Sequence, residues 1–233
     1  MSEPRPKVAV PVFPGSNDDR DAAWALHALG AEPALVWHRE PELPLDTGAV
    51  VLPGGFSYGD YLRCGAIARF APAMDAVARF AADGGPVLGI CNGFQILCEA
   101  GLLPGVLRPN RSLEFVCADV DVVVERTATP FTSRCDKGQR LTIPVKHGEG
   151  CWYADAALYE ELVALDQIVL RYDGESPNGS LHDVAGVCNR EGNVMGLMPH
   201  PEHAVDPLLG SADGAFILAS LVDSARARVP AGV

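Results

Sequence analysis

The feature that most constrains the fold is a series of short apolar runs, each ended by a glycine or proline turn or a charged segment. Four of these runs lie in the first part of the chain, at 7–13, 34–37, 49–52 and 86–90. Helices are predicted at 18–29, 66–82 and 92–100. Asn17 is the expected cap of the first helix, and Pro72 should kink or divide the second. Short, fully apolar runs are typical of parallel strands, because helices cover both faces of such a sheet. We therefore predict an α/β fold with a mainly parallel open sheet.

The second half of the chain has a different pattern. Residues 115–125 alternate, with valines on one face and Asp119, Asp121 and Glu125 on the other, which predicts a half-exposed strand in an antiparallel extension of the sheet. Further strands are predicted at 168–171, 185–189 and 194–197, and a closing helix at 212–227. No linker or repeat divides the chain. We expect a single domain over 1–233, with a core at about 7–226 and a frayed tail at 229–233.

Composition excludes several classes of protein. The chain has 233 residues, of which 48% are hydrophobic, and a formal net charge of −12. The hydrophobic fraction argues against disorder, and the negative charge argues against nucleic-acid binding. No apolar run is long enough to cross a membrane, and residues 1–6 contain no apolar signal core, so a cytoplasmic location is expected. The seven cysteines have irregular spacings, which predict neither a disulfide framework nor a metal site.

One cysteine lies in a context that suggests a nucleophile. The segment Gly89-Ile90-Cys91-Asn92-Gly93 begins at the end of an apolar run and opens a predicted helix. A strand–turn–helix of this form presents the central side chain above the sheet, and the helix N-terminus favours a thiolate. From the pentapeptide alone, an ordinary turn with a buried cysteine explains the pattern equally well.

A thiol nucleophile needs a base, and six histidines are available. His27 falls in a predicted helix and His38 at a strand end, whereas His147, His182 and His203 fall in predicted loops. His200 lies directly after the run 194–197, in Met198-Pro199-His200-Pro201-Glu202. The two prolines hold this segment extended, so Glu202, two residues further on, can orient the imidazole. We predict Cys91, His200 and Glu202 as the catalytic residues.

The third requirement is a pair of amides for an oxyanion. Pro53-Gly54-Gly55-Phe56 follows another apolar run, and therefore ends at the same edge of a parallel sheet as Cys91. A glycine amide from this turn, together with the Asn92 amide, would hold a developing negative charge.

Together these segments carry a resemblance. Cys91-Asn92-Gly93-Phe94-Gln95, Pro53-Gly54-Gly55 and His200-Pro201-Glu202 resemble the class I, or triad, glutamine amidotransferases. A longer pattern resembles one family among them, the glutaminase subunits of phosphoribosylformylglycinamidine synthase; it comprises residues 54–63, 89–95, 177–180 and 196–202. The resemblance covers about residues 8–222. It implies a flavodoxin-like sheet with an antiparallel extension, as in other class I amidotransferases.

The resemblance implies a reaction. Cys91 would attack the side-chain amide of glutamine and form a glutamyl thioester, with His200 moving the protons. Gln95 would bind the substrate, although a solvated helix residue is the alternative. His147 and Gly148 lie where related enzymes hold the amino-acid end of glutamine, and for His147 a structural role fits the sequence equally well.

The resemblance also implies partners. A large synthetase subunit would use the ammonia to convert formylglycinamide ribonucleotide to formylglycinamidine ribonucleotide in purine synthesis, and a small accessory subunit would complete the complex. ATP and Mg²⁺ are expected on the synthetase subunit, and no cofactor is expected on this chain, which has no Walker A motif.

Three alternatives stay open on the sequence. The first is a glutaminase subunit that serves another ammonia acceptor, which only residues 56–63 oppose. The second is a cysteine hydrolase or deglycase of the intracellular-peptidase superfamily, which typically lacks a residue like Glu202. The third is an inactive interaction subunit, which the intact Cys91, His200 and Glu202 oppose.

Overall fold

The computed structural model describes residues 5–228, so the tail expected at 229–233 lies outside the described residues. The strands are β1 (Lys7–Val12), β2 (Glu32–Trp37), β3 (Thr47–Leu52), β4 (Val87–Ile90), β5 (Val106–Arg108), β6 (Val116–Val124), β7 (Arg140–His147), β8 (Cys151–Tyr153), β9 (Ile168–Tyr172), β10 (Val184–Cys188) and β11 (Val194–Leu197). The helices are α1 (Asp19–Ala28), α2 (Pro72–Ala82), α3 (Asn92–Glu99), α4 (Ala156–Ala164) and α5 (Gly214–Arg228).

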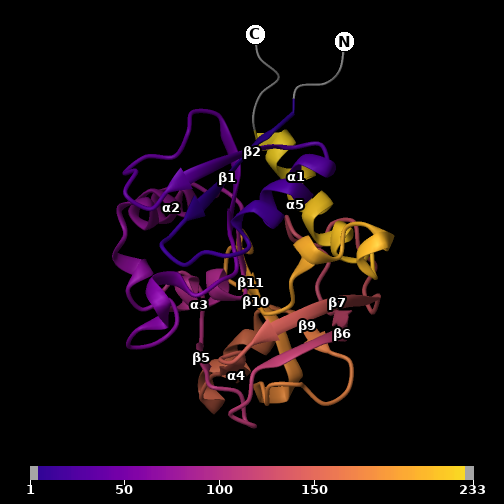
Figure 1. Ribbon diagram of the computed structural model, residues 1–233. Helices are drawn as coiled ribbons and strands as arrows, with labels where there is room; N and C mark the ends of the chain where they lie inside the picture. Colours follow the sequence, from indigo (N-terminus) through magenta and orange to yellow (C-terminus); the bar gives the residue numbers. More distant parts are fainter. Residues whose placement is uncertain (1–4, 229–233) are drawn as a thin grey trace.

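One large sheet organises the molecule (Figure 1). Its nine strands follow the order β2-β1-β3-β4-β11-β10-β9-β6-β7. The strands from β2 to β11 are parallel, and every pairing from β11 to β7 is antiparallel. The predicted fold class, a mainly parallel open sheet with an antiparallel extension, is therefore confirmed. Strands β5 and β8 form a separate antiparallel pair.

Helices cover both faces of the parallel strands. The chain moves from β1 to β2 in one direction along the sheet and from β3 to β4 in the other. Because such crossovers are right-handed, α1 and α2 lie on opposite faces. Figure 1 shows α5 beside α1 on one side, and α2 and α3 on the other. Among the described residues, no helix combines the length and the apolar character that a bilayer span requires.

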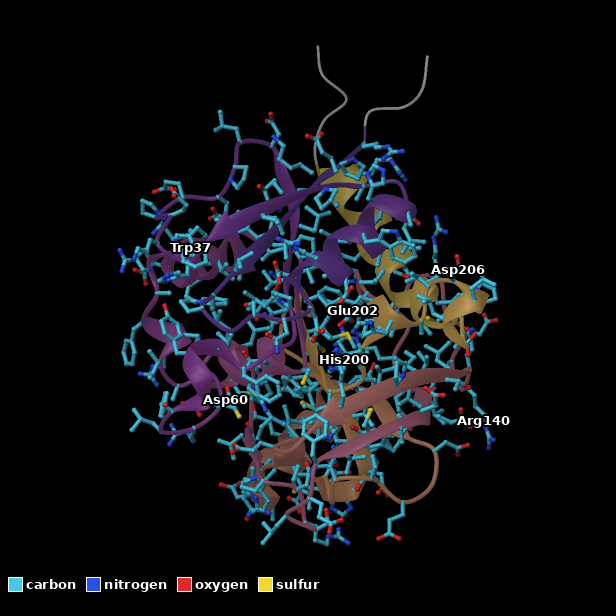
Figure 2. The ribbon with its side chains drawn as sticks, in the orientation of Figure 1. Trp37, Asp60, Arg140, His200, Glu202 and Asp206 are labelled. Atoms are coloured by element: carbon cyan, nitrogen blue, oxygen red, sulfur yellow. The ribbon has the colours of Figure 1, made fainter. Side chains whose placement is uncertain are left out.

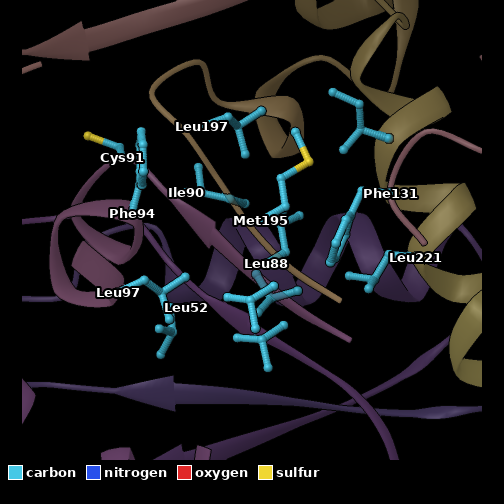
Figure 3. Close-up of a cluster of buried hydrophobic side chains, with 14 of the residues drawn as sticks. Leu52, Leu88, Ile90, Cys91, Phe94, Leu97, Phe131, Met195, Leu197 and Leu221 are labelled. Carbon is cyan, nitrogen blue, oxygen red and sulfur yellow. The ribbon is translucent and has the colours of Figure 1, made fainter. Parts of the chain in front are cut away.

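The core is built on the central strands. Leu88 and Ile90 of β4 and Met195 and Leu197 of β11 are buried between the helices. Figure 3 shows Phe94 and Leu97 of α3 on one side of these strands, and Phe131 with Leu221 of α5 on the other. Cys91 lies at the margin of this cluster, with its sulfur directed away from it. The apolar packing thus fixes the strand end from which the cysteine projects.

Several predicted elements differ in detail. The N-cap of α1 is Asp18 rather than Asn17, and its side chain makes no capping bond, because it is used in a contact described below. The helix expected at 66–82 is divided: a short 3-10 turn, Ala68–Phe70, precedes α2, in which Pro72 is the first residue. A proline has no amide hydrogen to contribute, so it fits the first turn of a helix and not its interior.

The prediction that His147 lies in a loop is wrong, because His147 is the last residue of β7. Strand β7 lies at the edge of the sheet, where a strand tolerates its internal Pro144. The sheet curls, so that this edge approaches the segment after β11, and the His200 amide donates a hydrogen bond to the Pro144 carbonyl (2.8 Å). The curl brings the end of β7 to the carboxyl ends of the parallel strands.

Candidate active site

A cavity lies at the carboxyl ends of β1, β3, β4, β7 and β11. Ligands in open α/β sheets bind at this edge. The cavity is lined by Asn17, Asp18, Gly55, Phe56, Asp60, Cys64, Cys91, Gln95, Phe115, Lys146, His147, Gly148, Glu149 and His200. Figure 2 shows His200 and Glu202 near the middle of the molecule, and Asp60 towards one side. The structure therefore brings the predicted nucleophile, base and oxyanion turn to one place.

Cys91 occupies a sharp turn between β4 and α3. Its backbone has φ 50° and ψ −104°, an unusual conformation for a residue with a side chain. The flanking glycines are required sterically: a Cβ on Gly93 would overlap the Leu52 carbonyl, and a Cβ on Gly89 would lie 2.7 Å from Gly93. The Cys91 amide donates to the Leu197 carbonyl at 2.8 Å, which ties the turn to β11. The thiol is thus held at the N-terminus of α3, facing the cavity.

His200 is oriented by Glu202 and is almost fully buried. Nδ1 of His200 lies 2.6 Å from Oε1 of Glu202, and each residue is only 1% exposed. Nε2 has no hydrogen-bond partner among the described residues, and so is free to exchange a proton. Burial disfavours a charged imidazole, but the negative charges of Glu202 and of the Cys91 thiolate outweigh it and raise the pKa of His200. The arrangement favours the imidazolium form of His200 next to the Cys91 sulfur.

Two backbone amides beside the glycine turn and the nucleophile are not used in the protein's own hydrogen bonds, as far as the structure describes the chain. The amides of Gly55 and Asn92 have no hydrogen-bond acceptor among the described residues, and Asn92 is the first residue of α3. The Phe56 amide, in contrast, donates to the Gly15 carbonyl (2.8 Å), although Phe56 lines the cavity. The Asn92 side chain accepts a hydrogen bond from the Ser57 amide (3.1 Å), which joins the glycine turn region to α3. This pair of free amides can stabilise an oxyanion.

The predicted substrate-binding residues Gln95, His147 and Gly148 also line the cavity. The Gln95 side chain accepts from Asn92 (2.9 Å) and donates to the Glu149 carbonyl (2.6 Å), so it holds the segment after β7 against α3. Asn178 lies 3.0 Å from Nε2 of His147. Burial, assisted by the charge of His200, lowers the pKa of His147 to about 4, so this imidazole is neutral near pH 7.

Sequence reasoning missed other polar residues of the cavity. Asp18 and Lys146 form an ion pair with 2.5 Å between Oδ1 and Nζ. The strand β7 that carries Lys146 could have been found from the alternation of Leu141, Ile143 and Val145 with polar residues, although Pro144 obscures it. Asp18 carries no local signal, since it resembles any acidic residue at the start of a helix.

Asp60 and Glu149 form a second missed group, next to Cys64. Burial raises the pKa of Asp60, and the charge of Glu149 raises it further, whereas hydrogen bonds from Cys64 and Asn92 oppose the shift. Neither carboxylate forms an ion pair within the part of the chain that the structure describes. This side of the cavity therefore holds two acidic side chains without a cationic partner among the described residues.

Four side chains could in principle surround a cation. The potential ligand atoms of Asp18, His200, Glu202 and His203 all lie within 4.8 Å of one another. Asp18 already contacts the Lys146 ammonium, and Glu202 already contacts Nδ1 of His200. Both carboxylates therefore already have a partner within the protein, Lys146 for Asp18 and His200 for Glu202.

The chain resembles characterised proteins over most of its length. The family of CobB/CobQ-like glutamine amidotransferase domains matches residues 5–213. Phosphoribosylformylglycinamidine synthase subunit PurQ of Rubrobacter xylanophilus is 57% identical, over 94% of this chain and 99% of the relative, and that of Gloeobacter violaceus is 56% identical, over 96% and 100%.

Solved structures show the same relationship. A chain of the PurLQS structure from Thermotoga maritima superimposes with a TM-score of 0.85 at 45% identity, covering 94% of this chain and 98% of that one. The glutaminase domain of Trypanosoma brucei CTPS, at 17% identity and a TM-score of 0.63, shares the fold. The chain belongs to the glutamine amidotransferase family and, within it, to the PurQ subunits of phosphoribosylformylglycinamidine synthase.

Proposed function

We propose that this chain hydrolyses glutamine at Cys91 and delivers the ammonia to the synthetase subunit of phosphoribosylformylglycinamidine synthase, which forms formylglycinamidine ribonucleotide. The observation that carries the proposal is the buried Glu202–His200 pair, with a free Nε2, beside a cysteine in a strand–turn–helix. The closely similar PurQ subunits support the choice of acceptor. The amidotransferase domain in this proposal is a single one, because one continuous core extends through both halves of the sheet.

The first half of the reaction forms a thioester. The Cys91 thiolate attacks the side-chain carbonyl carbon of glutamine, and the carbonyl oxygen becomes an oxyanion that the Gly55 and Asn92 amides stabilise. His200, as the imidazolium, gives its Nε2 proton to the leaving nitrogen. The C–N bond breaks, ammonia departs, and a glutamyl thioester with a neutral His200 remains.

The second half releases glutamate. Neutral His200 takes a proton from water at Nε2 as the water oxygen attacks the thioester carbon. The same two amides hold the second oxyanion, and the C–S bond breaks to regenerate the thiolate beside the imidazolium. Glu202 holds the imidazole orientation throughout and stabilises each imidazolium, which a buried carboxylate does effectively where the dielectric constant is low.

The carboxylates of Asp60 and Glu149 would make the site selective for a substrate that carries an ammonium group. Free glutamine carries an α-ammonium group. In this proposal the ammonium group lies on the side of the cavity formed by Asp60 and Glu149, near Gln95. His147 and Gly148 face the same cavity and contribute to the wall that holds the amino-acid end. A cation placed there offsets the charge that raises the pKa of Asp60.

The loop after β3 is the proposed docking element for the synthetase subunit. Tyr61 and Leu62 are strongly exposed apolar side chains beside the cavity, which favours a protein contact there. Arg63 forms a two-point ion pair with Glu99 of α3 (2.6 and 2.7 Å), so a partner that moves this loop acts on the helix that begins at the nucleophile. We infer that glutaminase activity is low in the isolated chain and rises in the complex, with ATP and Mg²⁺ acting on the synthetase subunit and a small subunit completing the assembly.

Ammonia rescue tests the proposal. In the assembled complex, Cys91→Ala should abolish glutamine-dependent amination and leave amination with ammonium salts at high pH intact. A glutamine-like alkylating agent should modify Cys91 of the wild-type protein. It should not modify Cys64, because burial and the neighbouring Asp60 raise the pKa of that thiol. Cys117→Ala, at an exposed cysteine, is the control. Glutamine-dependent turnover by the Cys91→Ala complex would overturn the assignment.

A further inference from the structure

Asp18 contacts two parts of the proposed site that are separate in the sequence. Its Oδ2 lies 3.6 Å from Nδ1 of His200, the nitrogen that Glu202 also contacts. Its backbone amide donates to the Gly54 carbonyl (3.3 Å), next to the turn that presents the Gly55 amide. The Asp18 side chain lies so close to Gly54 that a Cβ on that glycine would overlap it. One buried residue thus touches both the imidazole and the oxyanion turn.

Lys146 extends this connection to the nucleophile. Its ammonium lies 2.5 Å from Oδ1 of Asp18, and its carbonyl oxygen lies 3.8 Å from the Cys91 sulfur. The lysine comes from the edge strand β7 and the aspartate from the loop after β1, so the pair also fastens the curled edge of the sheet over the cavity.

Asp18 and Lys146 together add no net charge next to His200, whereas either residue alone would add one. The ionisable groups that face it are Glu202, Asp18, His203, His147 and Cys91, with Lys146 behind Asp18. Burial favours the neutral acid at Asp18, but His203, Lys146 and His200 outweigh it and hold the pKa of Asp18 well below its usual value. Asp18 is therefore ionised, and Lys146 offsets its charge.

We propose that the Asp18–Lys146 ion pair is a positioning element of the glutaminase site, which holds the imidazole, the oxyanion turn and the nucleophile in register and sets the charge that His200 experiences. The inference rests on the proposed function. In this account the two side chains act on the reacting groups indirectly: the Asp18 carboxylate lies against Nδ1 of His200, and the Lys146 ammonium lies against that carboxylate. Only the backbone carbonyl of Lys146 reaches the Cys91 sulfur.

Substitutions of Asp18 and of Lys146 should shift the pH profile of the reaction in opposite directions. Asp18→Asn leaves the Lys146 cation unbalanced and so disfavours protonation of the His200–Cys91 pair. Both limbs of the profile of kcat/KM against pH should therefore move to lower pH by about one unit. Lys146→Met leaves the Asp18 anion unbalanced and should move both limbs to higher pH. The double variant restores the charge balance, and its limbs should return close to those of the wild type.

The positioning role also predicts a change in kcat that is larger than the change in KM. Asp18→Asn should lower kcat by roughly 10²-fold, the size expected for a displacement of about 1 Å, with a much smaller change in KM. Lys146→Arg keeps the charge and should keep the wild-type limbs. Asp21→Asn is the control for general charge effects and should leave rate and profile unchanged, because Asp21 is an exposed acidic residue of α1, the helix that Asp18 precedes.

The experiment is a pH profile of glutamine-dependent amination by the assembled complex, with ammonia-dependent amination as a check on assembly. Limbs that stay in place in both single variants, or that move in the same direction, would overturn the proposal. If Asp18→Asn fails to fold, the comparison of Lys146→Met with Lys146→Arg still decides the matter. A wild-type complex without glutamine-dependent activity would instead contradict the proposed function.

Discussion

A Cβ placed on Gly54 would lie 2.7 Å from Cε1 of His200. The turn that follows β3 and the imidazole that follows β11 are therefore in direct contact, with no room for one methyl group between them. Glycine at this position is a requirement of the catalytic geometry and not of backbone conformation, because the crowding comes from side chains of the site.

The first prediction concerns this contact. Gly54→Ala should displace His200 or Asp18 and lower kcat by roughly 10²-fold or more, because small misplacements of catalytic groups are costly. Steady-state kinetics of the complex, with ammonia-dependent activity as the reference, measures the effect. The matched control is Gly84→Ala, which has open space around its Cβ and should cost only about 1 kcal/mol of stability from its positive φ. Equal activity of the two variants would contradict the prediction.

The second prediction concerns the orientation of His200. Glu202→Gln keeps the shape of the side chain but removes the charge that favours the imidazolium, so turnover should fall by anything up to roughly 10⁴-fold. The alkaline limb of the pH profile should move to lower pH, because the pKa of His200 falls when Glu202 is neutral. The melting temperature checks that the fold survives. Unchanged turnover would show that another group holds the imidazole.

The parts of the site that sequence predicts are those carried by short local motifs. Cys91, Gly93 and Asn92 form one turn, and His200 and Glu202 are two residues apart, so their relationship follows from the local backbone. The order of apolar runs predicts that both segments end at one edge of a parallel sheet. The fold class follows from the same pattern.

The remaining parts depend on contacts between distant segments. Asp18 and Lys146 are 128 residues apart and meet only because the antiparallel half of the sheet curls. Strand β7 was not predicted, since Pro144 argues against a strand unless that strand is known to be at an edge. The unpaired carboxylates Asp60 and Glu149 likewise become a group only once the end of β7 reaches the loop after β3.

The third prediction concerns acid stability. The pKa of His147 is about 4 in the folded chain and near 6.5 when unfolded. Between these values the unfolded state binds more protons, so this residue makes the protein progressively less stable as the pH falls from 6.5 to 4. The full loss is about 3 kcal/mol at 1.36 kcal/mol per unit.

Denaturant unfolding at several pH values measures this effect. His147→Asn lacks the titrating group, so its stability should fall less steeply than that of the wild type between pH 6.5 and 4. The comparison uses slopes, so a general loss of stability in the variant does not affect it. Parallel curves for the two proteins would mean that His147 binds its proton at the same pH in the folded and the unfolded chain.

The fourth prediction concerns recognition of the substrate's ammonium group. Asp60→Asn should lower kcat/KM for glutamine by roughly 10-fold or more, chiefly through KM, because an ion pair to a partly buried carboxylate is lost. The same variant should act on 4-carbamoylbutanoate, which lacks the α-amino group, as well as the wild type does. Glu149→Gln should show the same pattern. Equal losses with both substrates would indicate a structural role and leave the Cys91 chemistry unaffected.

The fifth prediction concerns docking of the synthetase subunit. Leu62 is 92% exposed and has a left-handed backbone with φ 73°, so it stands out from the loop beside the cavity. Leu62→Asp places a charge at an apolar contact and should weaken binding by at least 10-fold, since a charge buried without a partner is costly. Stability of the isolated chain should not change, because the side chain touches water there.

Leu45→Asp is the matched control: Leu45 is 84% exposed and lies in the loop before β3, at the opposite end of that strand from the cavity. Sedimentation or calorimetric titration with the synthetase subunit measures the affinity, and glutaminase assays with increasing amounts of that subunit measure the activation. Leu62→Asp should need more partner to reach the same activity, whereas Leu45→Asp should follow the wild type. Arg63 ties this loop to Glu99 of α3. If Leu62→Asp bound normally but was not activated, activation would depend on that ion pair rather than on the apolar contact. Normal binding and normal activation of Leu62→Asp would show that the synthetase subunit docks elsewhere.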